Sequence, residues 1–295
     1  MREGDRRVAA RQGPTYLRVA LGKEFQALRN EKGVTAEAVS VALGWSRPRV
    51  SRLETGEIPL PKLEDLHKLL DYLDVIDPDD RDTLVRMHKE SLRKEPFTSY
   101  RNMLPSGMPM YLGLERDARG IRGYENINVH GLLQCESYAR ALMGSAKVVE
   151  ERTTDAVETS VRLRMERKEL LLAEGGPELH IILTENTLTR QIGTPAVMRE
   201  QYAEIERLAR LENVDVQIIP ELGDEEMYRA AFNFTILDFP GLGSVVQSDS
   251  HRATTMWSKP SDLGQYQRQF QAMAKAAPGP SATPQILHNL EKLWK

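Results

Sequence analysis

The sequence predicts two domains of different structural class, an all-α N-terminal domain followed by a larger α/β or α+β domain. From Leu17 to Leu92, apolar residues recur every three or four positions, which is the period of an α-helix. From Glu95 to Gly113, prolines and glycines interrupt this pattern, although the segment is too apolar for a free linker. After Leu114, short strand-like runs alternate with helical ones, which favours a sheet covered by helices.

A chain of 295 residues is long enough for one small and one larger domain with a substantial core. The pattern changes predict a flexible basic tail at residues 1–14, a helical domain at 15–95, a packed linker at 96–113 and an α+β domain at 114–295.

Composition is typical of a globular protein, with 40% hydrophobic and 28% charged residues. No run approaches the ~20 apolar residues that span a bilayer, and no apolar run follows the charged N-terminus. We therefore expect no membrane partner and no signal peptide. The single cysteine, Cys135, excludes an internal disulfide framework and suits a reducing cytoplasm, where we expect the protein to act.

Charge is distributed unevenly along the chain. The net charge is −3, but residues 1–60 hold 11 Lys and Arg against seven Asp and Glu, so this part carries +4 and the remainder −7. A basic N-terminal part on an acidic body favours nucleic-acid binding by the first domain only.

The most informative stretch runs from Thr35 to Gly56, where the pattern predicts a helix, a sharp turn and a second helix. Thr35 can cap the first helix with its hydroxyl. Val39 and Leu43 lie four apart on one face, and Gly44 can adopt the left-handed conformation that ends a helix.

The second helix of this stretch opens at Ser46, a good N-cap residue, and Pro48 falls in its first turn, where a missing N–H breaks no internal bond. Val50 and Leu53 lie three apart and are expected to face inward. Gly56 is expected to end the helix in the left-handed conformation.

Three arginines, Arg47, Arg49 and Arg52, are left on the other faces of this second helix. A short helix, a tight turn and a basic second helix form the pattern that fits a DNA major groove. An ordinary pair of core helices is the alternative. It would show some of these features, but rarely two caps, a turn glycine, an apolar inner face and three arginines together.

The stretch resembles the Cro/repressor (XRE-type) helix-turn-helix. The matching residues are Val34-Thr35, Val39, Leu43-Gly44-Trp45-Ser46, Val50-Ser51-Arg52 and Leu53-Glu54-Thr55-Gly56. Two positions depart from the family pattern, because Pro48 stands where a polar reading residue is common and Ser40 where alanine is usual.

We expect Arg47 and Arg49 to contact base edges, since a guanidinium can pair with guanine through two hydrogen bonds. Hydroxyls and nearby backbone N–H groups would hold phosphates and set the register. The expected DNA-binding residues are Thr35, Ser46, Arg47, Pro48, Arg49, Ser51, Arg52 and Thr55. A single domain of this kind makes few contacts, so we expect a homodimer on two half-sites about one helical turn (~34 Å) apart.

Further helices complete the first domain. Two prolines at 59 and 61 force an extended turn, which in the family it resembles lies near DNA phosphates. Leucines at helical spacing predict a helix over 62–73, and Asp77-Pro78 signals the start of a fifth helix, which ends near Lys94.

The second domain is expected to mix helices and strands. Helices are expected at 114–124, 136–143, 149–173, 195–211, 262–276 and 285–294, and strands at the start of 127–133 and at 179–183, 214–219, 232–239 and 243–247.

The two domains together resemble a large actinobacterial class of XRE-type regulators, the WhiJ-like or antitoxin-like transcriptional regulators. The resemblance covers about residues 17–277. In the second domain it is carried by Tyr111-Leu112-Gly113-Leu114-Glu115, His130-Gly131-Leu132-Leu133-Gln134, Tyr138-Ala139-Arg140, Pro220 and Phe234-Thr235-Ile236-Leu237-Asp238-Phe239-Pro240. It implies DNA-binding regulation, often with a small partner protein encoded nearby, and supplies no catalytic activity.

The sequence holds no recognisable catalytic or metal-binding motif. The six histidines lack metal-ligand spacing, and neither a phosphate-binding loop nor a nucleophile elbow is present. We expect no catalytic residue, no metal and no cofactor, and therefore not an enzyme. Cys135 is expected to be a small buried side chain. Four aromatics are expected in the core more than around a ligand, namely Tyr124, Tyr138, Trp257 and Tyr266.

The leading hypothesis is a cytoplasmic, dimeric, sequence-specific regulator that binds double-stranded DNA. Two alternatives stay open. The acidic domain can be an antitoxin-like module that binds a small partner protein, or it can sense a small molecule.

Overall fold

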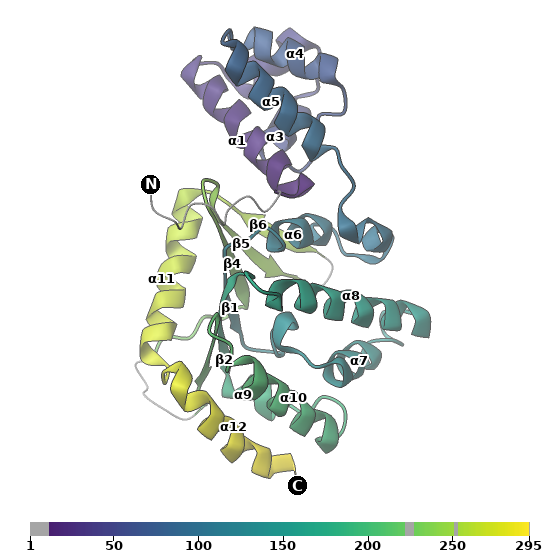
Figure 1. The fold of residues 1–295 in the computed structure, drawn as a ribbon, viewed down its shortest axis with the longest axis vertical. Coiled ribbons are helices and arrows are strands. Elements are labelled where there is room, and N and C mark those ends of the chain that lie inside the picture. Colours follow the sequence, from purple (N-terminus) through teal and green to yellow (C-terminus); the bar gives the residue numbers. More distant parts are fainter. Residues whose placement is uncertain (1–11, 222–226, 251–252, 295) are drawn as a thin grey trace. The chain divides into compact units, whose positions relative to one another are not determined.

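The computed structural model describes residues 12–221, 227–250 and 253–294. It divides into two compact units, Met1–Ser99 with Leu112–Asp117, and Tyr100–Tyr111 with Ala118–Lys295. Figure 1 shows the helices and strands of each unit. The first is helical and the second holds a mixed sheet with helices, which confirms the predicted fold class. The domain boundaries expected at 95 and 113 stay predictions, and most of the expected tail, residues 1–11, lies outside the described residues.

The first unit is a small helical domain. Its helices are α1 (Pro14–Glu31), α2 (Ala36–Leu43), α3 (Arg47–Glu54), α4 (Leu63–Tyr72) and α5 (Pro78–Ser91). Helix α1 begins three residues before the apolar period that starts at Leu17, because Pro14 occupies its first turn, where its fixed φ suits a helix.

The predicted inner faces form the core of this unit. Val39, Val50 and Leu53 are buried together with leucines of α4, among them the fully buried Leu66 and Leu70. Leu66, Leu69 and Leu70 lie on one face of α4 at helical spacing, and this face packs α4 into the same core as the inner faces of α2 and α3.

Helix α1 crosses α3 closely because Gly22 has no side chain. A Cβ at Gly22 would lie 2.4 Å from the carbonyl oxygen of Leu53 and 2.6 Å from that of Glu54. No real side chain tolerates such distances, so glycine is what permits this crossing.

A buried ion pair fixes the end of α3 to α1. Arg29 Nε lies 2.5 Å from Glu54 Oε1, and Arg29 Nη2 donates to Glu54 Oε2 at 3.0 Å. Arg29 Nη1 also donates to the carbonyl of Val34 at 2.9 Å. The guanidinium fork therefore ties together α1, the start of α2 and the end of α3.

The second unit is built on one six-stranded sheet in the order β3-β2-β1-β4-β5-β6. The strands are β1 (Gly120–Glu125), β2 (Glu178–Thr184), β3 (Val214–Ile219), β4 (Phe234–Phe239), β5 (Gly243–Asp249) and β6 (Thr254–Trp257). Strands β1, β2 and β3 are parallel, whereas β4, β5 and β6 continue the sheet antiparallel.

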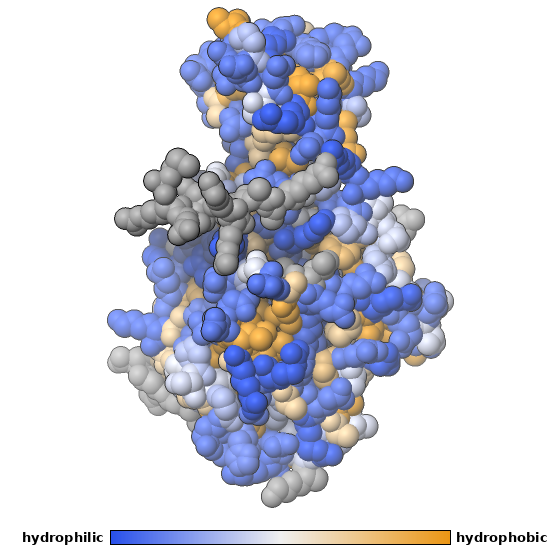
Figure 2. Space-filling model, in the orientation of Figure 1, coloured by the Kyte–Doolittle hydropathy of each residue, from blue (hydrophilic) through white to orange (hydrophobic). Residues whose placement is uncertain are grey.

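Helices cover both faces of this sheet (Figure 1). Helix α11 lies on one face, and α7, α8 and α10 lie on the other. Two short helices, η2 (Pro96–Met103) and α6 (Met108–Glu115), contain residues of both units. The other helices and short 3-10 turns of the second unit are η3 (Gly131–Leu133), α7 (Glu136–Ser145), α8 (Thr154–Leu172), α9 (Glu185–Thr189), α10 (Pro195–Leu208), α11 (Pro260–Ala276), η4 (Pro280–Ala282), α12 (Thr283–Glu291) and η5 (Lys292–Trp294). Most of the visible surface of each unit is hydrophilic, with a small hydrophobic area near the middle of the second unit (Figure 2).

Two sequence predictions in this unit are wrong. The helix expected at 114–124 is instead the end of α6, a turn and strand β1, which pairs with β2 on one side and β4 on the other. The strand expected at the start of 127–133 does not form, and Gly131–Leu133 is a 3-10 turn. Strand β1 pairs on both of its edges with segments more than 50 residues away in the sequence. The local sequence pattern therefore could not indicate that this segment is a strand. Helices α6 and α9 and strand β6 were not predicted.

Of the four aromatics expected in the core, Tyr124 and Tyr138 are fully buried, and Trp257 and Tyr266 are partly buried and pack against the core. Tyr124 and Phe234 have ring centroids 6.0 Å apart, and Tyr266 stands 5.0 Å from Phe234 and 5.7 Å from Trp257. The buried hydroxyl of Tyr124 donates to the carbonyl of Ala230 at 3.1 Å, so its polar end is satisfied within the protein.

Candidate DNA-binding site

The turn between α2 and α3 has the predicted geometry. Thr35 caps α2, because its hydroxyl oxygen accepts from the N–H of Ala38 at 3.1 Å. Gly44 ends the helix in the left-handed conformation with φ 63°, and the N–H of Trp45 returns to the carbonyl of Ser40 at 2.8 Å. This hydrogen-bonded stop sets the direction in which the chain enters α3.

Helix α3 also begins and ends where the sequence predicts. Ser46 is the N-cap residue and has an extended backbone. Within the described residues of α3, its hydroxyl makes no capping hydrogen bond to the first turn. Pro48 lies in that first turn, and Gly56 follows the helix with φ 69°. The Ser46 hydroxyl is exposed and therefore accessible to a ligand.

The three arginines of α3 have different surroundings. The Arg47 side chain is 76% exposed, with Nη1 4.0 Å from Glu37 Oε2. The Arg52 side chain is 49% exposed, and its Nε donates to Glu57 Oε1 at 2.9 Å. Both pairs lie at the surface, where such ion pairs are weak and exchange readily with other anions.

Arg49 is held more firmly than the other two. Its Nη2 donates to Asp65 Oδ2 on α4 at 2.6 Å, and its guanidinium lies over the Trp45 ring at 4.2 Å. Its side chain is only 29% exposed.

The expected DNA-binding residues lie together on the start of α2, the turn and α3. All except Arg49 are exposed: Thr35, Ser46, Arg47, Pro48, Ser51, Arg52 and Thr55. The Thr55 hydroxyl donates to the carbonyl of Arg52 at 3.2 Å, which leaves its oxygen able to accept a second bond. Their contact with DNA stays a prediction.

Sequence reasoning missed the residues that support this surface. Asp65 and Trp45 contact Arg49, and the Arg29–Glu54 pair anchors the end of α3. Hydrogen bonding to Glu54 raises the pKa of Arg29. The sequence gives one indication of this pair, because Glu54 is an acid inside a basic segment. Its partner Arg29 is 25 residues away, so no local pattern identifies it.

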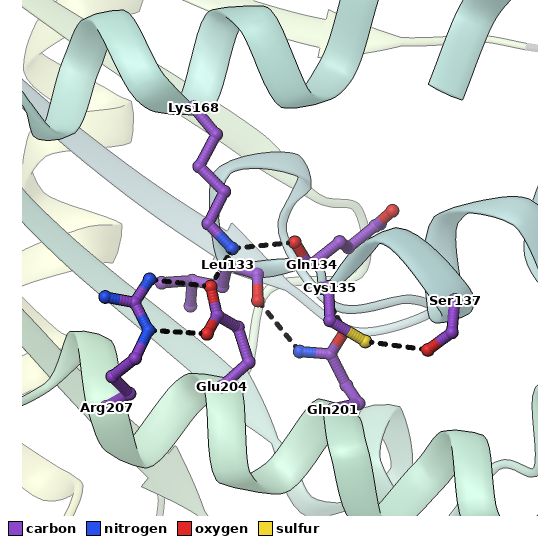
Figure 3. Close-up of polar contacts among 8 residues, drawn as sticks. All are labelled: Leu133, Gln134, Cys135, Ser137, Lys168, Gln201, Glu204 and Arg207. Carbon is purple, nitrogen blue, oxygen red and sulfur yellow. Dashed lines mark hydrogen bonds and ion pairs between the residues drawn. The ribbon is translucent and has the colours of Figure 1, made fainter. Parts of the chain in front are cut away.

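The second unit contains a buried polar network around the segment Leu133–Cys135 (Figure 3). Lys168 of α8 donates to the carbonyl of Gln134 at 2.9 Å and is ion-paired with Glu204 of α10. Burial lowers the pKa of Lys168, although Glu204 opposes this effect. The network joins α8 and α10 through one segment of main chain.

Gln201 completes this network. Its side-chain N–H₂ donates to the carbonyl of Leu133 at 2.8 Å, while its oxygen accepts from the N–H of Cys135 at 2.9 Å. The Cys135 side chain is buried, as expected. These bonds satisfy main-chain groups that would otherwise be buried without partners, so the network is structural.

A carboxyl group with a raised pKa lies at the end of β1. Burial raises the pKa of Glu125 to about 8, with a further contribution from the charge of Asp249, while Arg164 and a hydrogen bond from Asn233 oppose the shift. The carboxyl ends of parallel strands are common ligand sites in open sheets. Within the described ranges, no group of three or more His, Cys, Asp or Glu side chains is arranged to hold a metal ion.

The fold and the exposed face of α3 define a protein with a helix-turn-helix first unit and an α/β second unit. The chain belongs to the family described as "Domain of unknown function (DUF5753)", whose model matches residues 108–289. A model described as a helix-turn-helix domain matches residues 20–84. Comparisons with curated proteins and with solved structures found no match. Across the part of the chain that the structure describes, no helix has the length and apolar character needed to cross a membrane.

Together, these findings support a DNA-binding regulator with a second domain of unknown function.

Proposed function

We propose that the protein is a sequence-specific transcriptional regulator that binds double-stranded DNA as a homodimer, with α3 in the major groove. The observation that carries this proposal is the start of α3, where the exposed Arg47 stands beside Arg49, while the Arg29–Glu54 pair fixes the other end of the helix to α1. Recognition helices of this class contact base edges with their N-terminal residues.

Each part of the surface has a distinct role in this proposal. Arg47 and Arg49 read base edges, because guanidinium donors match the acceptors N7 and O6 of guanine. Thr35, Ser46 and Thr55 bind phosphates and fix the register of α3 in the groove. Arg52 adds charge beside the groove and exchanges its surface partner Glu57 for a phosphate.

The second unit supplies dimerisation and regulation in this proposal. Residues 100–295, which form most of this unit, hold 22 Lys and Arg against 26 Asp and Glu, so their net charge of −4 does not favour binding to DNA. In a dimer, the two helix-turn-helix units would bind half-sites one helical turn apart. Their contacts would add, and the dimer would bind DNA more tightly than one unit alone.

A small-molecule sensor is a second candidate role for the second unit. It is favoured by the half-buried Glu125 at the carboxyl end of β1, where an added ligand charge would change its protonation. Thermal unfolding with a metabolite panel tests it, and an absence of any shift counts against it. Co-purification tests the other possibility, an antitoxin-like module that binds a small protein encoded nearby.

Gel shift of the purified protein on DNA upstream of its own gene, across a salt series, tests the proposed function. We expect binding that survives unrelated competitor DNA and weakens steeply with salt, by about 10³-fold between 50 and 200 mM if six or more phosphates are contacted. Binding that competitor DNA abolishes at every salt concentration would refute a sequence-specific regulator.

A further inference from the structure

Asp65 and Trp45 hold Arg49 from two directions at once. Arg49 Nη2 donates to Asp65 Oδ2 at 2.6 Å, and the Trp45 ring lies 4.2 Å from the guanidinium carbon. The ion pair fixes one edge of the planar guanidinium and the ring fixes one face, so the remaining freedom of the group is small.

The two supporting residues are themselves well anchored. Trp45 packs against the hydrophobic core of the first unit. Asp65 lies in the first turn of α4, where the helix dipole favours a carboxylate, and its neighbour Leu66 is fully buried. The Asp65 side chain is only 17% exposed. The contact is therefore largely shielded from solvent and packed against the core of the domain.

The surroundings of Arg49 contrast with those of the other two arginines of α3. Arg47 and Arg52 have side chains 76% and 49% exposed, with partners that are themselves at the surface. Arg49 is the third residue of α3, where side chains of a recognition helix reach base edges.

A guanidinium has five N–H groups, and the bond to Asp65 uses one of them. The others can donate to O6 and N7 of a guanine. An arginine that is already oriented loses little conformational freedom when it binds a base, and it rejects bases that present a donor at the same place.

We propose that Asp65, with Trp45, positions Arg49 for guanine and so determines the sequence specificity of the recognition helix. This inference rests on the proposed function. Asp65 acts through Arg49 and is a positioning residue. A competing role is restraint, in which Asp65 keeps Arg49 away from DNA, and the two roles predict changes of opposite sign when Asp65 is removed.

The test begins with a duplex that the full-length protein selects from a random pool. Dissociation constants are then measured for this duplex and for single base-pair replacements through one half-site. The variants are Arg49→Ala, Asp65→Ala, the double variant and Glu64→Ala. Glu64 is the matched control, because it is the other acid in the first turn of α4 and pairs with Lys68.

We expect Arg49→Ala and Asp65→Ala to weaken the preference for guanine at the same position by about tenfold, the discrimination that about 1.4 kcal/mol provides. The double variant should lose no more than Arg49→Ala alone, and Glu64→Ala should keep the preference. Thermal unfolding confirms that each variant is folded, and Asp65→Asn replaces Asp65→Ala if that variant is unstable.

Two results would overturn the inference while leaving the proposed function intact: an unchanged preference in a folded Asp65 variant, or tighter binding by it. A wild-type protein that selects no duplex would overturn the proposed function and this inference together.

Discussion

At the scale of single residues, the surface of α3 is defined by how firmly each arginine is held. Arg47 is the most exposed of the three, and its nearest acid, Glu37, lies 4.0 Å away and is itself exposed. Its guanidinium is therefore available to DNA at little cost, because a surface ion pair of this kind contributes less than about 1 kcal/mol.

Replacing Arg47 by alanine tests its role as a base-reading residue. We expect specific binding to weaken by about 1–3 kcal/mol and selectivity to relax at one base pair. Titration of a labelled duplex measures both. Arg210→Ala in the second unit is the control, since Arg210 is similarly exposed at 74% and pairs with Glu206. An equal loss of affinity for every sequence would instead assign Arg47 to a phosphate.

Glu125 makes stability depend on pH with a predictable sign. The folded protein raises the pKa of this carboxyl from 4.5 to about 8, so the folded state keeps a proton that the unfolded state has lost. Below about pH 4.5 the carboxyl is protonated in both the folded and the unfolded state, so it does not change the free energy of unfolding with pH. Between pH 4.5 and 8 stability falls as pH rises, and above pH 8 the loss is constant.

Glu125→Gln should remove this dependence. We expect the stability of the variant relative to the wild type to rise by on the order of 1–3 kcal/mol from pH 5 to pH 9. This is less than the full pKa shift implies, because the residue is half-buried. Denaturant unfolding at the two pH values measures it, with the exposed Glu178→Gln as control. A constant difference between Glu125→Gln and the wild type would contradict the raised pKa.

At the scale of elements, the first unit depends on close helix crossing. Gly22 allows α1 to approach the main chain at the end of α3, and Arg29 then holds that end through Glu54. The position of α3 is therefore set by contacts on its buried side. Among its arginines, Arg49 also pairs with another helix, whereas Arg47 and Arg52 make only surface contacts.

Gly22→Ala should destabilise the first unit. The added methyl group would lie 2.4 Å from a carbonyl oxygen, so the helices must separate, and we expect a loss of about 1–3 kcal/mol. Thermal unfolding measures it. Gly144→Ala in α7 is the control, because a Cβ there meets nothing within 4 Å and should stabilise the helix by about 0.5–1 kcal/mol. Equal behaviour of the two variants would contradict the close crossing.

Local signals predicted the elements of the first unit well. The caps at Thr35 and Asp77 and the left-handed glycines Gly44 and Gly56 are all confirmed, because each depends on residues within four positions. The Ser46 hydroxyl was expected to cap α3 and does not. The supports of Arg49 include Asp65, 16 residues away on another helix, which no local pattern reveals.

At the scale of the whole molecule, the sequence predicted the class of each unit but not the sheet order. Strand β1 holds two glycines and lies at the centre of the sheet, where it is fixed by pairing with distant strands. Its segment was therefore mistaken for helix. The family of the second unit is established by residues 108–289, and its regulatory role is a proposal.

The central claim is that α3 reads sequence from the major groove, and substituted bases test it most directly. Guanines in the selected duplex are replaced one at a time by 7-deazaguanine, which lacks the major-groove acceptor N7 but pairs normally, and by inosine, which lacks the minor-groove amino group. The account predicts that 7-deazaguanine weakens binding by about 1–3 kcal/mol at one or two positions per half-site, and that inosine at the same positions does not. Loss of binding with inosine but not with 7-deazaguanine would contradict it.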